Sequence, residues 1–161
     1  MSADAQPMQP VSIGEAALRD AEKITARIAA DEAAATAAME AYAVGGLPSI
    51  EPDDGARALF LAGEQLHAVH GSALLEAPTT GEDDALPRGG TLYLTSARLL
   101  HVGTETTNVA LSEIVDVTVA LERLVQVRRL DGSDLALEVD QPRLLRVQLM
   151  TALAGIRATQ P

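Results

Sequence analysis

The chain has 161 residues, 12 basic and 23 acidic side chains, and a formal net charge of −11 at pH 7. It contains two Tyr, one Phe, no Trp and no Cys. An acidic chain lacks the basic surface that follows nucleic-acid phosphates, and three aromatic rings offer few platforms for stacking bases, so we expect no nucleic-acid partner. Without cysteine, disulfides, cysteine-ligated metals and cysteine nucleophiles are excluded.

The composition indicates a globular chain with an aliphatic core, because 47% of the residues are hydrophobic and very few of these are aromatic. No stretch of about 18 apolar residues is present, so the sequence predicts no membrane span. Residues 1–11 read as a disordered lead, without the basic start and apolar run of an export signal. We therefore expect a cytoplasmic protein of bacterial type.

A long helical arm is predicted over residues 12–44. Ser12 and Glu15 have the spacing of a capping box, and Gly45 with Gly46 provides a helix stop. The length also allows a helical hairpin with a break near residues 31–32. Apolar residues recur at helical spacing, and five of them are candidate interaction residues: Leu18, Ile24, Ile28, Met39 and Tyr42.

The arm has three possible uses, because its apolar stripe must be buried against something. It can pack on its own domain, pair with a second copy of itself, or bind an unknown protein partner. Residues 45–55 read as a linker rich in Gly, Pro and acids. Residues 1–55 carry ten acids and three bases, which is seven of the eleven surplus negative charges.

From residue 56 to residue 161 the hydrophobic period changes from helical to strand-like. Short connectors, including Asp131-Gly132 as a hairpin turn, separate the strands. A last helix follows, with Asp140 as its N-cap and Pro142 in its first turn. The predicted strands cover residues 66–75, 91–94, 98–102, 108–111, 115–121, 124–130 and 135–139.

This order predicts a mainly-β α+β fold: a seven-stranded antiparallel barrel or sandwich, capped by a C-terminal helix and preceded by the long helix or helical hairpin. The run from Gly90 to Leu100, GTLYLTSARLL, resembles the central signature of GRAM and bacterial PH-like domains. Residues 61–66 and 111–117 are similar to two further segments of that family. The resemblance covers roughly Phe60 to Ala158, excludes the arm, and implies the fold without implying a ligand.

The charge of one loop argues against the best-known use of that fold. Lipid-binding PH domains hold anionic head groups with basic residues around the loop between the first two strands. Here the loop from Glu76 to Gly90 carries four acids and a single Arg. An anionic lipid would meet like charge there, so membrane binding is disfavoured.

No catalytic, cofactor or metal-binding motif stands out. His67, His70 and His101 are the only histidines, and they would need a carboxylate and convergence in space to form a metal site. Physical roles are clearer for the signature: Gly90 suits a close backbone approach, Thr95 and Ser96 can close a turn, and Arg98 can pair with an acid.

The sequence thus predicts a non-catalytic PH/GRAM-like interaction or scaffold module that binds protein, as a peptide or a helix, and needs no cofactor. The alternatives are a peripheral membrane or lipid-binding module and a small His/carboxylate metal-dependent enzyme. Besides the five residues of the arm, the candidate interaction residues are Tyr93 and Arg128. For Arg128 and the nearby arginines, ordinary surface pairing with Glu122, Asp131, Asp134 or Asp140 is the competing interpretation.

Overall fold

The computed structural model describes residues 13–76 and 88–161. Three helices, seven strands and one short 3-10 turn make up these residues. In chain order they are α1 (Ile13–Gly45), α2 (Asp54–Arg57), β1 (Leu66–Glu76), β2 (Arg88–Thr95), β3 (Arg98–Val102), β4 (Thr106–Ala110), η1 (Leu111–Glu113), β5 (Ile114–Ala120), β6 (Leu124–Arg129), β7 (Asp134–Val139) and α3 (Pro142–Thr159).

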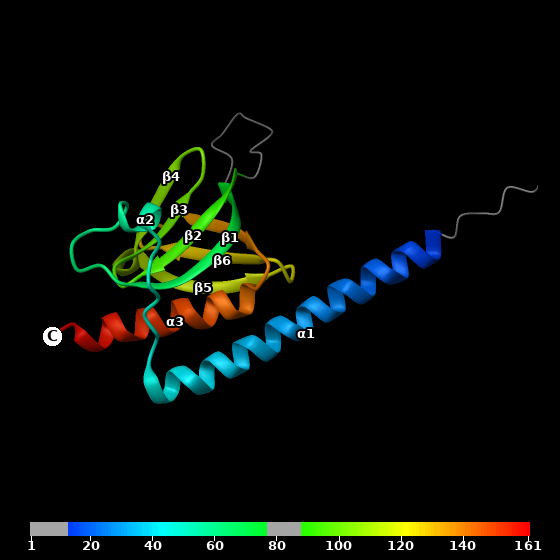
Figure 1. Cartoon of the computed structure of the whole chain (residues 1–161), viewed down its shortest axis with the longest axis horizontal. Coiled ribbons are helices and arrows are strands. Elements are labelled where there is room, and N and C mark those ends of the chain that lie inside the picture. Colours follow the sequence, from blue (N-terminus) through cyan, green and yellow to red (C-terminus); the bar gives the residue numbers. More distant parts are fainter. Residues whose placement is uncertain (1–12, 77–87) are drawn as a thin grey trace, which may run out of the picture.

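The strands form one antiparallel sheet in the order β4-β3-β2-β1-β7-β6-β5, with α3 packed along one face (Figure 1). Alternate residues of the strands point into an aliphatic core, and α3 contributes Leu145, Leu149 and Leu153 to it. The predicted strand-rich fold with a C-terminal helix is confirmed. Two predictions lie outside the described residues: the capping role of Ser12, and most of the predicted acidic loop, namely residues 77–87.

One prediction is wrong at the start of α3, where the sequence assigned the N-cap to Asp140. Asp140 does not cap the helix: the N-cap position is Gln141, and its side chain makes no capping hydrogen bond. Pro142 does occupy the first turn, as predicted. The free N–H groups of this turn are instead satisfied from a different helix, by Asp31 of α1.

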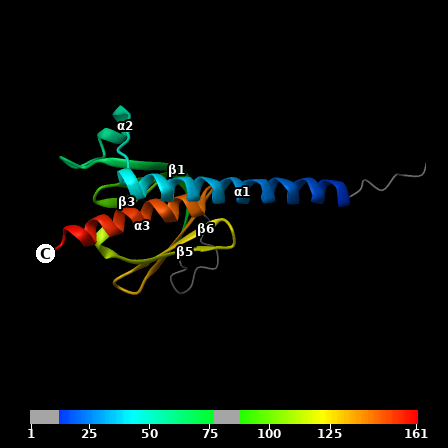
Figure 2. The ribbon, with the colours of Figure 1, turned by 90° about the horizontal axis from the view of Figure 1, so that it is seen from below.

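A single unbroken helix replaces the predicted alternative of a hairpin in the arm. α1 runs for 33 residues, about 50 Å, without a break near residue 31. Only its second half lies on α3, and the first half projects beyond the body of the molecule (Figures 1 and 2). The backbone stays helical through Asp31, and the carboxylate of Asp31 lies in the contact between α1 and α3.

Gly90 confirms the predicted close approach of two backbones. A Cβ at this position would lie 2.3 Å from the carbonyl oxygen of Val102, on the neighbouring strand, and 2.9 Å from a ring carbon of His101. Neither a backbone carbonyl nor a buried ring can move far in a paired sheet. The position therefore requires glycine for lack of space.

Replacing Gly90 by Ala is expected to lower the free energy of unfolding by about 2 kcal/mol, the cost of overpacking a tight site. Denaturant unfolding monitored by circular dichroism measures it. The matched control is Gly89→Ala on the same strand, where a Cβ meets no atom within 4 Å. Equal effects of the two substitutions would show that the close approach does not constrain the sheet.

Candidate functional site

The three histidines do not converge on a common site. His67 Nδ1 lies 2.8 Å from the carbonyl oxygen of Pro48, and His70 Nε2 lies 2.7 Å from the side-chain oxygen of Gln148. The strand register places His70, Leu92 and His101 in one row across β1, β2 and β3. The buried Leu92 thus separates the last two histidines by two strand spacings, roughly 10 Å. Among the described residues no group of three His, Asp or Glu side chains can hold a metal ion.

The signature turn between β2 and β3 is a buried polar cluster. Thr95 Oγ1 accepts hydrogen bonds from the backbone N–H groups of Ala97 and Arg98, as the sequence predicts for this turn. Arg98 pairs with Glu64, with Nε to Oε1 at 2.9 Å, and the side chains are 13% and 2% exposed. Arg98 also donates to the carbonyl of Leu59. The predicted acid partner of Arg98 therefore exists, and the cluster fastens residues 59–64 to the sheet.

Two of the candidate interaction residues, Tyr93 and Arg128, make contacts with other side chains of the same chain. The ring of Tyr93 packs edge-to-face on Phe60, with centroids 5.9 Å apart and an interplanar angle of 81°. Arg128 Nε lies 3.7 Å from an oxygen of Asp134, with both side chains more than half exposed. This is the surface pairing that the sequence allowed.

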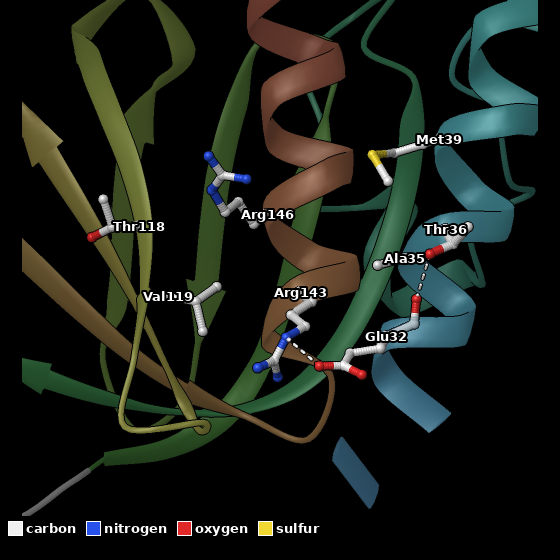
Figure 3. A pocket seen from close by; sticks show the side chains of 8 residues that line it. All are labelled: Glu32, Ala35, Thr36, Met39, Thr118, Val119, Arg143 and Arg146. Atoms are coloured by element: carbon white, nitrogen blue, oxygen red, sulfur yellow. Dashed lines mark hydrogen bonds and ion pairs between the residues drawn. The ribbon is translucent and has the colours of Figure 1, made fainter. Parts of the chain in front are cut away.

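A pocket of about 670 Å³ lies where α1, α3 and β5 meet (Figure 3). Met39, the fourth candidate residue of the arm, lies on its wall and is 53% exposed. Sequence reasoning identified only this residue of the pocket as an interaction candidate. Its lining consists of Glu32, Ala35, Thr36, Met39, Thr118, Val119, Arg143 and Arg146.

Arg143 is the most heavily paired cation of this pocket. Its guanidinium pairs with Glu122 and lies 3.7 Å from an oxygen of Asp31 and 3.7 Å from an oxygen of Glu32. The hydrogen bond and charge of Glu122, with the charges of Glu32 and Asp31, raise the pKa of Arg143 despite partial desolvation. Glu122 is held in the β5–β6 turn, at a positive φ of 58°. The pairing links this turn to α1 and α3.

The pocket presents charged and hydroxyl side chains that can contact a ligand. Its ionisable side chains are one carboxylate and two guanidinium groups, and its hydroxyls are those of Thr36 and Thr118. The Thr36 hydroxyl donates to the Glu32 carbonyl, within the helix. Arg146 Nε donates to the carbonyl of Val117 at 3.0 Å, and Arg146 forms no ion pair with another described residue. The pocket can thus receive an anionic side chain but presents no activated nucleophile.

The second candidate surface is a seam on α1, defined here as Ala17, Ala21, Ile24, Ile28, Asp31, Ala35, Ala38 and Tyr42. Successive members of the seam are alternately four and three residues apart, which is the repeat of a helix-pairing face. From Asp31 onward the seam lies against α3, where Asp31, Ala35 and Ala38 are buried and Tyr42 is half-buried. Residues 14–26 are exposed all round, so the same face continues uncovered.

Asp31 marks the point at which the covered half of the seam begins. It is 1% exposed, and its two oxygens accept from the backbone N–H groups of Arg143 at 2.9 Å and Leu144 at 3.1 Å. A carboxylate thus caps the N-terminus of α3, where the helix dipole favours negative charge. Sequence reasoning missed this role because Asp31 lies 112 residues from Arg143. The available signal was an acid that falls on the apolar stripe.

The five candidate residues of the arm lie in different environments. Leu18 and Ile24 are 64% and 47% exposed on the projecting half, and Ile28 is half-buried at the boundary. Tyr42 belongs to the covered half. Ile24, Ile28 and Tyr42 share the seam, Leu18 flanks it, and Met39 faces the pocket. The predicted apolar stripe and the seam thus coincide at Ile24, Ile28 and Tyr42 and differ at Leu18 and Met39.

Comparisons with known proteins leave the family open. No family model and no curated protein matches the chain. A solved structure that resembles it is the C-terminal domain of an unknown protein from Leishmania infantum, with 20% identity and a TM-score of 0.49. The match covers 58% of this chain and 87% of that domain. No helix within residues 13–76 and 88–161 is long and apolar enough to cross a bilayer.

Proposed function

We propose that the chain is a non-catalytic interaction module of the PH/GRAM-like kind, acting in the cytoplasm, and that it binds protein through the projecting half of α1. The observation that carries this proposal is the seam: its second half is buried on α3, and its first half continues the same repeat without a cover. An isolated helical segment of this length is marginal in water, so a bound helix would stabilise it.

The remaining surfaces support a binding role more than a catalytic one. The histidines are separated, and the pocket beside the arm offers Arg146 and Met39 as an anion-accepting and an apolar contact. A partner helix on the arm would reach this pocket only with a side chain or a second segment. The arm therefore supplies the main contact in this proposal.

A face-specific substitution tests the role of the arm. Ala21→Glu places a charge on the uncovered seam, and Ala26→Glu places the same charge on the outer face of the same helix; both alanines are exposed. Affinity purification from the native extract with the full chain should retain the same proteins for the parent and Ala26→Glu. Ala21→Glu should lose them, because a charge is not tolerated in a packed helix seam.

The monomers of both variants should keep the stability of the parent monomer, because both alanines are exposed on the projecting half of α1. Identical proteins retained by all three chains would overturn the role of the arm. Flotation with vesicles of anionic phospholipid, abolished by Ala21→Glu and not by Ala26→Glu, would favour the membrane-binding alternative over the protein-binding one. We expect no flotation of any of the three chains.

A further inference from the structure

We infer that the partner of the projecting half is a second copy of this chain, and that the two α1 helices pair antiparallel about a point between Glu22 and Lys23. The inference rests on the proposed function and names its partner. Three features of the chain support it. They are the point on the seam at which α3 begins, the sizes and charges of the side chains on and beside the uncovered half, and the distribution of charge along the chain.

The position of α3 selects the antiparallel arrangement. α3 begins level with Asp31 and occupies the seam from there to Tyr42. A parallel second helix would follow the seam in the same direction and meet α3. An antiparallel second helix with the proposed centre instead places its Ile13 level with Glu32. It therefore fills the uncovered half of the seam and ends where α3 starts.

The side chains on the uncovered seam complement one another in this register. Ala17 faces Ile28 of the second copy, and Ala21 faces its Ile24. Each small residue thus meets a large one, in two layers that the two-fold symmetry repeats. A small residue opposite a branched one allows the helices to approach closely while Ile24, 47% exposed in the single chain, becomes covered.

The charges that flank the seam are also complementary. Asp20 and Arg27 occupy equivalent positions one heptad apart, so Asp20 faces Arg27 of the second copy, and the reciprocal pair forms by symmetry. Neither side chain forms an ion pair with another described residue of its own chain. The other edge of the seam carries Leu18 opposite Thr25, an uncharged contact.

The overall charge favours the same arrangement. Residues 13–30 contain three acids and three bases and are neutral, whereas the whole chain has a net charge of −11. Antiparallel pairing puts the neutral segments in contact and carries the two acidic bodies to opposite ends. Like charges are then kept apart, which a side-by-side arrangement of the bodies would not achieve.

Light scattering on the purified full chain, from about 1 µM to about 1 mM, tests the association. The mass should rise from 16.8 kDa toward twice this value. Ala21→Glu should remain monomeric over the range, and Ala26→Glu should match the parent. Asp20→Arg and Arg27→Asp should each weaken dimerisation by about tenfold, because attraction becomes repulsion at both symmetric pairs. The double swap should restore it.

Engineered cysteines test the register, because the parent chain has none. Positions 17 and 28 are about 16 Å apart along one helix, too far for an internal disulfide. Mild oxidation of the double variant Ala17→Cys/Ile28→Cys should yield a covalent dimer, and neither single variant should. A covalent dimer from Ala17→Cys alone would indicate parallel pairing and overturn the inference.

A monomer at every concentration would also overturn it, as would a double swap that fails to restore dimerisation. These failures are distinct from a failure of the proposed function. A purified chain that stays monomeric, while extract proteins still bind the parent and not Ala21→Glu, disproves self-pairing and leaves the arm as a binding element for another protein.

Discussion

Replacing Glu64 by Gln is expected to lower the free energy of unfolding by about 3 kcal/mol, as is typical when one partner of a buried ion pair is removed. The carboxylate is 2% exposed and accepts hydrogen bonds from Arg98, Thr95 and the backbone N–H of Leu61. The amide can satisfy some of these donors, but it leaves the guanidinium of Arg98 in the interior without its counter-ion. Residues 59–64 then lose their main attachment to the sheet.

Denaturant unfolding measures this change, and an exposed pair gives the control. Arg57 pairs with Glu51, and both side chains are more than half exposed. Glu51→Gln should change the stability by less than about 0.5 kcal/mol, because surface ion pairs contribute little. Equal losses for the two substitutions would contradict the importance of burial.

The same substitution has a pH signature. Burial alone would raise the pKa of Glu64, but the hydrogen bonds from Arg98, Thr95 and Leu61 outweigh it and hold the pKa below its ordinary value of 4.5. A lowered folded-state pKa stabilises the fold fully above the unfolded value and loses its effect as the pH falls through the folded value. The stability difference between parent and Glu64→Gln should therefore be constant above about pH 5 and shrink at lower pH. A pH-independent difference would contradict this.

Replacing Asp31 by Ala is expected to lower the free energy of unfolding by about 2 to 3 kcal/mol. The substitution removes both acceptors for the first N–H groups of α3, and these donors then remain without partners in a part-buried contact. Alanine is the better helix former, so helix propensity alone predicts a gain for α1. The sign of the measured change thus separates the capping role from propensity.

Glu32→Ala is the matched control for Asp31→Ala, because it makes the neighbouring carboxylate an alanine in the same helix. Glu32 is 60% exposed, and its oxygen lies 3.7 Å from Arg143. We expect a change within about 0.5 kcal/mol. Asp31→Asn, which keeps one acceptor oxygen, should lose less stability than Asp31→Ala. A loss at Glu32 as large as that at Asp31 would point to the charge of Arg143 as the cause.

Local signals in the sequence sufficed for most elements. Alternation of apolar and polar residues predicts the strands, and the ends observed in the structure differ from the predicted ones by at most three residues. Asp131-Gly132 closes the β6–β7 connection, with Gly132 at a positive φ of 83°. Glycine at residue 90 and threonine at residue 95 have the roles that their chemistry predicts. Each of these features depends on neighbours in the chain or on the adjoining strand.

The sequence pattern did not predict contacts between residues that are far apart in the chain. Asp31 lies where the length of the arm allowed a break, and nothing in its local sequence indicated a partner for its side chain. Its carboxylate is instead enclosed by a helix more than 100 residues away, and no local pattern reports such a contact. Asp140, adjacent to α3 and of suitable type, is the locally obvious cap that the packing does not use.

The strand-rich domain, the C-terminal helix, the long arm and the acidic net charge can all be read from the amino-acid sequence alone. These follow from period and composition, which are properties of consecutive residues. Two further features are evident only in the folded chain: the arm is one continuous helix, and α3 covers only half of its seam. The boundary depends on where α3 begins in space, and the carboxylate of Asp31 sets that point by holding the first N–H groups of α3.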